Sequence, residues 1–475
     1  MRTFEFILIL THGLSILRFL SRWLRKRLPS PWFELAALLM LGLHLGLEHY
    51  RWQMLPTYIL LILILTVGWL RFRQAPASGR PRRSLVLFTG FVGILFLSST
   101  LLPILLPVPQ LTPPTGPYAV GTRSWHWIDS ERVDLYAPTA RAQRELMIQA
   151  WYPIEKDVQG ERSPWMPSAE IVAPAVAQWL NLPSFFLDHL VLVSSLALED
   201  ADIATNAQGF PVLLFSHGFG GFRAQNTHQM QHLASNGFVI LAVEHTYASV
   251  VSVFPDGRVA YHNPDTLPDG LPPLDDLQAA RDLGTQWAED LSFVLDQLTT
   301  LQLGSNQNEW QDKLDLTRVG AFGHSTGAGA AIEFCFRDSR CSATLPLDPF
   351  MKPVSENALQ EGLRYPSLHM FSELWPSDEN LERFTPFAQQ GYPKPLVLSV
   401  LGSDHYDFSD LPLLSPLAHR IGLKGPINGN RMISLVDTYL LAYFDQMLKD
   451  HPSDLLSSPS SDYPEVIYQS LIADS

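Results

Sequence analysis

Val319-Gly-Ala-Phe-Gly-His-Ser-Thr-Gly-Ala-Gly329 is the most informative segment of this chain. It holds a G-x-S-x-G motif between an apolar run of strand length and a run of small residues that favours a tightly packed helix. Such a strand-turn-helix lifts the central hydroxyl out of its backbone, so Ser325 is the predicted nucleophile. Gly323, His324 and Gly327 complete the turn, where a side chain on either glycine would clash. The motif predicts an α/β fold with a mostly parallel central sheet flanked by helices.

A serine nucleophile needs a base within hydrogen-bond reach and a carboxylate that orients this base. In folds built around this turn the chain order is serine, acid, histidine. Downstream of Ser325, Asp348 closes the strand-like run Thr344-Leu-Pro-Leu, and His405 follows the strand-like run Leu398-Ser-Val-Leu. Both residues therefore stand where strand ends deliver side chains. We predict Asp348 as the acid and His405 as the base.

Other residues compete for these two roles. His324 neighbours the nucleophile but points elsewhere, His369 lies inside an apolar run, and His419 follows a proline on an expected helix. Three aspartates near His405 could orient its ring, although acids so close in sequence are more often solvated loop charges; they are Asp404, Asp407 and Asp410. Asp348 and His405 remain the preferred pair.

Acyl transfer also needs hydrogen-bond donors for the developing oxyanion, and these are usually backbone amides. A buried-looking strand, Pro211-Val-Leu-Leu-Phe-Ser, runs into the glycine turn His217-Gly-Phe-Gly-Gly221. This turn has the form of an oxyanion loop. The predicted donors are the amides of Phe219 and Thr326.

The same turn has an alternative interpretation as a dinucleotide-binding fingerprint. Gly218-x-Gly220 follows a strand, and Glu244 ends the next one. The third glycine of that fingerprint is missing from Phe222-Arg-Ala, and a dinucleotide site would leave Ser325 without a role. We therefore prefer the oxyanion loop.

A series of sequence blocks follows one order along the chain: Val120-Gly-Thr-Arg-Ser-Trp-His126, Leu146-Met-Ile-Gln-Ala-Trp-Tyr-Pro153, Phe215-Ser-His-Gly-Phe-Gly-Gly-Phe-Arg223, Leu233-Ala-Ser-Asn-Gly-Phe-Val239, Ala242-Val-Glu-His245, Gly323-His-Ser-Thr-Gly327, Leu347-Asp348, Gly402-Ser-Asp-His405 and Lys424-Gly-Pro-Ile-Asn428. In this order they resemble the plasma-type (type II-like) platelet-activating-factor acetylhydrolases, which are α/β hydrolases. The resemblance runs from about Val120 to about Leu448. It implies Ser325 as nucleophile, Asp348 as acid, His405 as base, and Phe219 and Thr326 as oxyanion donors, in agreement with the spacing.

The resemblance further implies a calcium-independent serine esterase without a cofactor that cleaves short or oxidised acyl chains from phospholipids. Bacterial relatives include lipase-like and polyester-cleaving enzymes, so a general esterase or polyester hydrolase is an alternative. Two positions depart from the family pattern: Thr326 replaces a residue that is often bulky and apolar, and Ala328 replaces a common glycine. Both are expected beside the pocket, so they bear on acyl preference and not on the reaction class.

The N-terminal part differs from the rest of the chain in its long apolar segments. Residues 33–49, 55–70 and 84–107 are strongly apolar and close to the roughly 17 to 25 residues that span a bilayer as a helix. Residues 4–20 are a fourth candidate. We expect a transmembrane anchor over residues 1–107, with helices near 4–24, 33–49, 55–70 and 84–107.

Basic links between the apolar segments set the expected orientation. One cluster consists of Arg18, Arg22, Arg25, Lys26 and Arg27, and a second consists of Arg71, Arg73, Arg80, Arg82 and Arg83. The positive-inside rule places both in the cytoplasm. Because the first cluster follows its apolar stretch, we expect this stretch to stay attached and not to be cleaved as a signal peptide. The expected location is the bacterial plasma (inner) membrane, with the catalytic domain facing the periplasm or the exterior.

The charge balance separates the two parts. Residues 1–110 carry 12 basic and 3 acidic residues, and the remaining 365 residues carry 21 and 44. The second part is therefore strongly acidic and repels nucleic acid. The expected partners are a lipid or other ester substrate and the membrane, with no nucleic acid and no obligate protein partner.

The domain plan follows from composition. The proline-rich run 108–118 favours extended backbone and links the anchor to a catalytic domain at 119–450, followed by a tail at 451–475. Residues 163–208 predict a cap whose apolar side chains line an acyl pocket, touch lipid or pack as ordinary helices; they include Trp165, Met166, Trp179, Phe185, Phe186 and Leu190. A helix at 277–301 should bury one face made of Ala280, Trp287, Leu291, Val294 and Leu298.

Two residue pairs carry weaker signals. Cys335 and Cys341 either bridge in an oxidising compartment or are buried as free thiols, and the sequence leaves both open. His228 and His232 have the spacing of zinc ligands, but no H-E-x-x-H glutamate and no third ligand accompany them. No metal site is expected.

Two other functional classes remain as alternatives. A non-catalytic, membrane-tethered binding module on a hydrolase fold would commonly have lost the serine or the histidine, whereas every catalytic position is filled here. A transporter would need polar groups inside its spans, and His44 and Glu48 are the few candidates.

Overall fold

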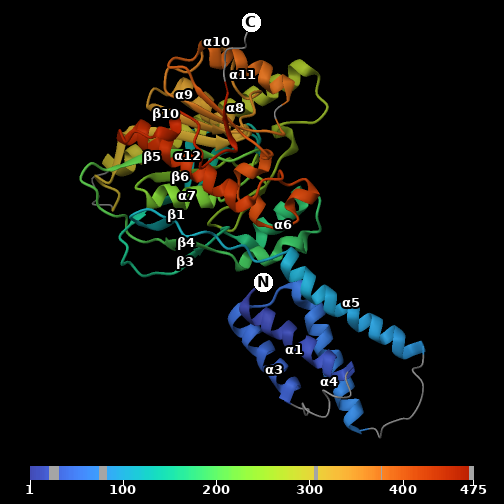
Figure 1. Cartoon of the computed structure of the whole chain (residues 1–475). Coiled ribbons are helices and arrows are strands. Elements are labelled where there is room, and N and C mark those ends of the chain that lie inside the picture. The colour runs from blue at the N-terminus through green and yellow to red at the C-terminus, as the bar shows by residue number, and fades with distance from the viewer. Residues whose placement is uncertain (21–31, 74–82, 304–308, 376, 470–475) are drawn as a thin grey trace. The chain divides into compact units, whose positions relative to one another are not determined.

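A computed structural model describes residues 1–20, 32–73, 83–303, 309–375 and 377–469 of the chain (Figure 1). These residues form two compact units. The first contains Met1–Pro109 with the short segments Asp188–Val193 and Leu414–Leu417, and the second contains the rest. Several predicted features lie outside the described residues, namely part of the helix expected at 4–24, most of the two basic clusters and the end of the tail.

One large sheet organises the second unit. Within the described residues it has 11 strands in the order β13-β12-β11-β10-β9-β5-β6-β2-β1-β4-β3. Neighbours from β12 to β6 run parallel, whereas β13, β2 and β3 pair antiparallel with their neighbours. The strands are β1 (Ala119–Val133), β2 (Gln143–Ile154), β3 (Arg162–Pro164), β4 (Ser194–Glu199), β5 (Phe210–Ser216), β6 (Val239–Glu244), β9 (Leu314–His324), β10 (Cys341–Leu347), β11 (Leu368–Ser372), β12 (Leu396–Val400) and β13 (Val466–Tyr468). The predicted α/β fold with a mostly parallel central sheet is confirmed.

Helices cover both faces of this sheet, and strand β5 shows why. All its residues are buried, and successive side chains point to opposite faces. Val212 and Leu214 join the core under α8 (Pro273–Leu303) and α9 (Thr326–Arg337). Leu213 and Phe215 join the core under α7 (Thr227–Ser235) and α12 (Gly429–Lys449). A strand buried on both faces reads as a continuous apolar run, as the sequence of β5 does.

The long helix α8 buries the face that its sequence predicts. Its apolar residues at helical spacing are fully covered; they are Ala280, Trp287, Leu291, Val294 and Leu298. The same core, under α8 and α9, also receives residues of the shorter helices α10 (Glu356–Glu361) and α11 (Asp378–Gln390).

The segment predicted as a cap has a mixed structure. It contributes the helix α6 (Ala169–Trp179) and the 3-10 segment η3 (Ser184–Leu192), but also β3 and β4, which extend the sheet. Strand β4 pairs parallel with β1 at Gly121 and Thr122, and β3 pairs antiparallel with β4. The segment is thus partly an edge of the sheet and not only a cap of helices.

The two cysteines form a disulfide. Cys335 lies near the end of α9 and Cys341 begins β10, and their sulfur atoms are 1.94 Å apart. Of the two alternatives that the sequence leaves open, the bonded one holds. The bridge ties the helix behind Ser325 to the strand that leads to Asp348.

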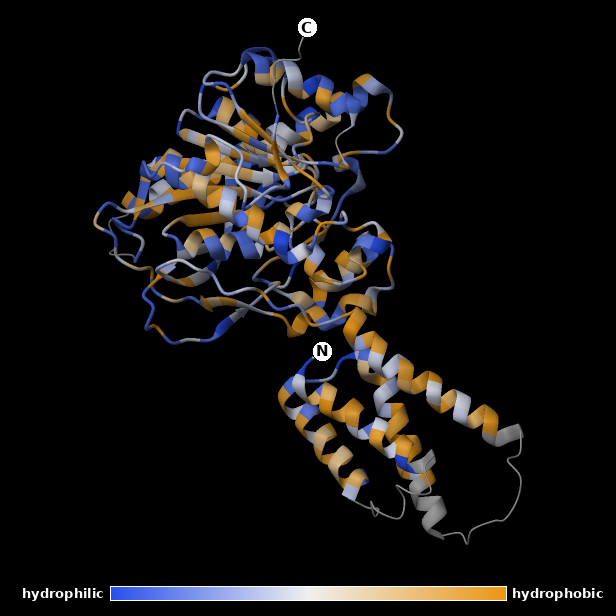
Figure 2. Cartoon of the chain, viewed as in Figure 1, coloured by the Kyte–Doolittle hydropathy of each residue, from blue (hydrophilic) through white to orange (hydrophobic). Residues whose placement is uncertain are grey.

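Helices make up the first unit. They are α1 (Thr3–Leu20), α3 (Trp32–Leu43) with the π-helical turn η1 (His44–Glu48), the short η2 (Trp52–Met54), α4 (Leu55–Arg73) and α5 (Arg83–Leu105). Figure 2 shows that hydrophobic residues dominate the described parts of these helices. Among the described helices, the segment Val86–Leu105 is long and apolar enough to cross a membrane, and Trp52–Val67 is a shorter apolar segment. A bundle of three or four membrane-spanning helices is therefore a proposal.

A buried ionic network joins the ends of these helices. Both oxygens of Glu5, which is fully buried, accept hydrogen bonds of 2.7 Å from the Arg51 guanidinium. Glu48 accepts from the amides of Phe4 and Glu5, and so caps the start of α1. His44 lies between Glu48 (3.1 Å) and the Tyr58 hydroxyl (2.8 Å). Buried charges persist where they are paired in this way.

Candidate active site

Ser325 stands at a strained turn between β9 and α9. Its φ of 57° and ψ of −121° lie in a region that side chains other than glycine rarely adopt. A β-carbon on Gly323 would lie 2.4 Å from the carbonyl oxygen of Gly327, and one on Gly327 would lie 2.2 Å from that of Ser216. Both glycines are therefore required by the close approach of neighbouring backbone. The predicted elbow has the geometry that its sequence implies.

His405 and Asp348 are brought together from different parts of the chain. His405 Nδ1 lies 2.7 Å from Asp348 Oδ2. Asp348 follows β10, is fully buried, and accepts two further hydrogen bonds from the amide (2.9 Å) and hydroxyl (2.8 Å) of Ser372. The indole of Trp375 stacks on the His405 ring at 3.9 Å. With Nδ1 engaged, Nε2 is the ring nitrogen left to meet a substrate or a hydroxyl.

The three competing aspartates have other partners. Asp404 caps the short helix that begins at His405. Asp407 accepts from the amides of Asp404 and Gly425. Asp410 accepts from the indole of Trp165 at 3.1 Å.

The competing histidines are also accounted for. His324 is buried, and its Nε2 lies 2.9 Å from the carbonyl oxygen of His405. His369 is buried against Phe384 and Phe387. His419 lies 3.2 Å from the carbonyl oxygen of Lys424. None of these rings is placed as His405 is.

The glycine turn after β5 lies against Ser325. A β-carbon on Gly218 would be 3.5 Å from that of Ser325. The amide of Gly218 donates to Gln225, that of Gly220 to Ala248, and that of Gly221 back to Gly218. Among the described residues, the amides of Phe219 and Thr326 donate to no protein acceptor. These are the two amides that the sequence predicts as oxyanion donors.

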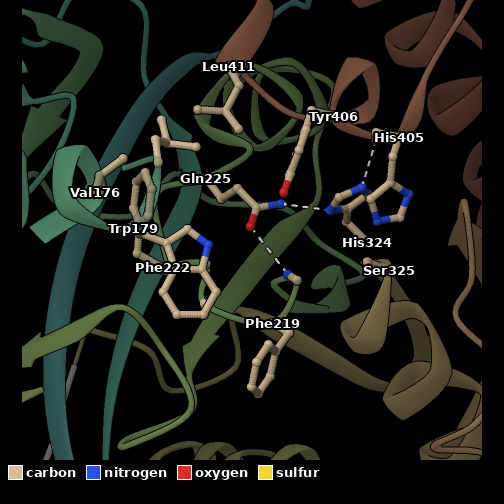
Figure 3. A pocket seen from close by; sticks show the side chains of 14 residues that line it. Val176, Trp179, Phe219, Phe222, Gln225, His324, Ser325, His405, Tyr406 and Leu411 are labelled. Atoms are coloured by element: carbon tan, nitrogen blue, oxygen red, sulfur yellow. Dashed lines mark hydrogen bonds between the residues drawn. The ribbon is translucent and has the colours of Figure 1, made fainter. Parts of the chain in front are cut away.

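A pocket of about 220 Å³ opens at this point. Figure 3 shows Ser325, His324 and His405 together on one side of it, with Trp179, Val176 and Phe222 on another. The lining also includes Leu180, Phe219, Gln225, Tyr406 and Leu411. The wall is mainly apolar, with polar groups gathered near the serine, as in pockets for small esters.

A second serine, histidine and aspartate form a similar set in the core. Ser216 Oγ lies 2.8 Å from His245 Nε2, and His245 Nδ1 lies 2.8 Å from Asp290. All three side chains are fully buried, and Arg144 binds the Asp290 carboxylate. Burial lowers the pKa of His245 to about 4, against the opposing effect of Asp290. This set fixes the strand end beneath the oxyanion loop and has no access for a substrate.

The possible metal ligands have other partners as well. His228 Nδ1 lies 2.8 Å from Asp437 on α12, and His232 Nδ1 lies 4.0 Å from the same carboxylate. In the first unit, Glu5, His44 and Glu48 lie close enough to hold a cation. There the guanidinium groups of Arg2 and Arg51 already bind Glu5, so this cluster is an ion-pair network.

Comparison with known proteins places this site in a class. A solved ferulic acid esterase from Streptomyces cinnamoneus is similar with a TM-score of 0.64 and 28% identity, over 76% of this chain and 100% of that one. The chain is thus an esterase with an α/β fold, a hydrolase of carboxylic esters.

The family follows from the sequence match. The model of the family platelet-activating factor acetylhydrolase, isoform II, matches residues 107–262 and 287–455, and the chain belongs to this family. A platelet-activating factor acetylhydrolase of Cavia porcellus is 26% identical, over 70% of this chain and 77% of the relative. A probable 1-alkyl-2-acetylglycerophosphocholine esterase of Arthroderma benhamiae is 23% identical, over 75% and 93%.

Sequence reasoning missed several residues around the site. Ser372 and Trp375, which hold Asp348 and His405, carry no motif that would single them out. Gln225 lies just after the glycine turn, and that proximity was the one available signal. Of the apolar residues named in the cap segment, Trp179 lines the pocket, whereas Trp165 is buried against Asp410.

Proposed function

We propose that this protein is a membrane-anchored serine esterase that cleaves short or modified acyl chains from phospholipids or related lipids. The observation that carries the catalytic proposal is that Ser325 and His405 line one pocket while Asp348 holds the His405 ring from behind at 2.7 Å. This arrangement supports a serine hydrolase, a class recognised by geometry and roles. The names of the relatives support an ester of a glycerophospholipid as substrate.

The proposed reaction has two acyl-transfer steps. His405 Nε2 takes the proton of Ser325 as its oxygen attacks the ester carbonyl, and the amides of Phe219 and Thr326 donate to the oxyanion. Protonated His405 then gives this proton to the leaving alcohol, which leaves Ser325 acylated. A water molecule, deprotonated by His405, attacks the acyl-enzyme, and His405 returns this proton to the Ser325 oxygen as the acid is released. Asp348 keeps the Nδ1 proton in place throughout.

A substitution and a probe test this proposal together. Ser325→Ala should lower kcat for p-nitrophenyl acetate by at least about 10³-fold while the melting temperature stays the same. A fluorophosphonate probe should label the natural protein at Ser325 and leave the variant unlabelled. Full activity of the Ser325→Ala protein, or labelling at another serine, would contradict the assignment.

The size of the pocket supports a short acyl group. About 220 Å³ is below the usual range of about 300 to 1,000 Å³ for sites of drug-sized ligands. A panel of esters of graded acyl length, run beside phospholipids with short and long sn-2 chains, tests this. A preference for acetyl phospholipids supports an acetylhydrolase, and equal turnover of simple or polymeric esters supports the general esterase alternative.

The membrane anchor rests on exposed apolar surface in the first unit. Helix α5 leaves large apolar side chains uncovered along its length; they include Val86, Leu87, Phe91, Ile94, Leu97 and Leu101. Helix α1 does the same with Phe6, Leu10, Leu14 and Leu17. Apolar patches of this extent are rare on proteins surrounded by water. We propose that several of these helices lie in a bilayer and that the catalytic unit faces an oxidising exterior, which the disulfide supports.

A further inference from the structure

The side chain of Gln225 joins two loops of the site that the mechanism uses separately. It is 6% exposed and lies in the wall of the pocket. Its Oε1 accepts a hydrogen bond of 3.2 Å from the amide of Gly218, the residue before the predicted donor Phe219. Its Nε2 lies 3.1 Å from His324 Nδ1 (Figure 3). His324 Nε2 in turn lies 2.9 Å from the carbonyl oxygen of His405.

The Gly218 amide at one end and the His405 carbonyl oxygen at the other determine which atom donates in each of these hydrogen bonds. The carbonyl oxygen of His405 can only accept, so His324 Nε2 carries a proton and donates it. Burial, followed by the charge of nearby His405, holds the pKa of His324 well below its usual value, so the ring is neutral and Nδ1 accepts. Gln225 must therefore present its NH₂ group to His324, which leaves Oε1 for Gly218. The amide N–H of Gly218 requires the same orientation.

The backbone around Gln225 strengthens the link. The amide of Asp410 donates to the carbonyl oxygen of Gln225 at 3.0 Å. The side-chain amide of Asn226 donates to the carbonyl oxygen of Phe408 at 2.6 Å. Residues 225 and 226 therefore hold the loop that follows His405 at two further points. Through its side chain, Gln225 also contacts the oxyanion loop and the nucleophile elbow.

We propose that Gln225 is a positioning residue that fixes the oxyanion loop relative to the catalytic base through one ordered chain, Gly218–Gln225–His324–His405. This inference rests on the proposed function, because it assigns Phe219 as a donor and His405 as the base. Among the described residues, the Gln225 side chain makes no hydrogen bond to Ser325 or to the His405 ring. It sets the register between the amide of Phe219 and the imidazole, which must meet opposite sides of the same tetrahedral centre.

The first test replaces the amide by an apolar side chain of similar size in the full-length protein. Gln225→Leu should lower kcat for p-nitrophenyl acetate by about 10- to 100-fold, because a displacement of about 1 Å in an oxyanion donor has a cost of that order. KM should change by less than about threefold. Affinity for a trifluoromethyl ketone, whose serine adduct carries an oxyanion, should fall by a factor similar to that of kcat.

A matched control separates positioning from a loss of stability. Gln229 is also a buried glutamine, four residues further on, and its amide has no hydrogen-bond partner among the described residues. Gln229→Leu should keep kcat within about twofold, because no hydrogen bond is lost. An equal loss of kcat in both variants, or an unchanged ketone affinity in Gln225→Leu, overturns the proposal.

A second variant, Gln225→Glu, keeps the hydrogen bond with Gly218 and tests which atoms between Gly218 and His405 carry protons. In Gln225→Glu one carboxylate oxygen can still accept from Gly218, while the other meets His324 Nδ1, which must then carry a proton. His405, whose ring centre lies 4.5 Å from that of His324, is the titratable group facing this ring. The ratio of kcat/KM for Gln225→Glu to that of the natural protein should therefore fall as pH rises and His324 loses the added proton. A ratio independent of pH rejects this assignment of protons.

The failure of this inference can be told apart from the failure of the proposed function. Ser325→Ala is assayed with the same substrate and probe. If Ser325→Ala is inactive and Gln225→Leu is fully active, the positioning role is wrong and the esterase mechanism stands. If Ser325→Ala is active, the mechanism itself is wrong.

Discussion

Asp348 is separated from His405 by 57 positions, yet it binds the imidazole, whereas Asp404 lies next to His405 and does not. The reason is the direction of the side chains. Asp348 leaves the end of β10 with a φ of 47° and is held by two hydrogen bonds from Ser372. Asp404 turns back to cap its own helix. Proximity in sequence therefore does not decide which acid binds the His405 ring.

The contrast between these two acids gives a prediction. Asp348→Asn should lower kcat by about 10³- to 10⁴-fold, because an amide in that place favours the wrong tautomer of His405. Asp404→Asn is the control and should keep activity within about threefold, since asparagine is as good a helix cap as aspartate. Kinetics on p-nitrophenyl acetate measures both. A larger loss in Asp404→Asn than in Asp348→Asn would assign the acid to Asp404.

Asp410 is a buried carboxyl whose ionisation bears on stability. Burial raises its pKa to about 7, against the opposing effects of His228 and the Trp165 indole. In the unfolded chain the pKa is about 3.9. Between these two values the folded protein holds a proton that the unfolded chain has lost, so stability falls as pH rises through this window. The nearby charged groups are His228 and Asp437.

The prediction for Asp410 compares its asparagine variant with the natural protein. Asp410→Asn cannot ionise but can still accept from the Trp165 indole. The two proteins should have similar melting temperatures near pH 4, and the variant should become increasingly the more stable one as pH rises to 8. Thermal melts across this range measure the difference. A gap that is constant with pH would show that Asp410 ionises normally.

At the scale of elements, helix α6 limits one end of the pocket. The indole of Trp179 at the end of α6 lies over the oxyanion loop, where a β-carbon on Gly220 would be 2.2 Å from it. Its ring centre lies 5.9 Å from that of Phe219. We therefore expect Trp179 to block a longer acyl chain.

Shortening this side chain should change the acyl preference. Trp179→Ala should raise the ratio of kcat/KM for octanoyl over acetyl esters by about 10-fold or more, because each buried methylene contributes about 0.8 kcal/mol. Glu170→Ala, an exposed position on the same helix, is the control and should leave the ratio unchanged. An unchanged ratio in Trp179→Ala would place the acyl group elsewhere in the pocket.

Element by element, predictability follows the strength of the local pattern. Strand β5 is buried on both faces, so its sequence is a continuous apolar run. Helix α8 is buried on one face, so its apolar residues recur at helical spacing. Strands β3 and β4 carry no such pattern. They exist because β1 offers a free edge at Gly121 and Thr122, and a distant edge is not a property of the local sequence.

At the scale of the whole molecule, a basic, apolar N-terminal part precedes an acidic catalytic part. The proposed topology places the two basic links in the cytoplasm and everything after residue 107 outside. A phosphatase reporter that is active only outside the membrane should be active when fused after Gln110 and inactive when fused after Gln74. Activity at both positions, or activity of the shorter fusion alone, would reject this topology.

The reaction class, a candidate nucleophile at Ser325 and the sheet around it could be predicted from the sequence, because the elbow motif and the flanking apolar runs are local. Packing between distant elements was needed to bring Asp348, and not a nearer acid, to His405, to bond the two cysteines, and to let Gln225 link two loops of the site. These contacts join residues far apart in the chain. Their geometry depends on how strands and helices pack, and a one-dimensional pattern does not carry that information.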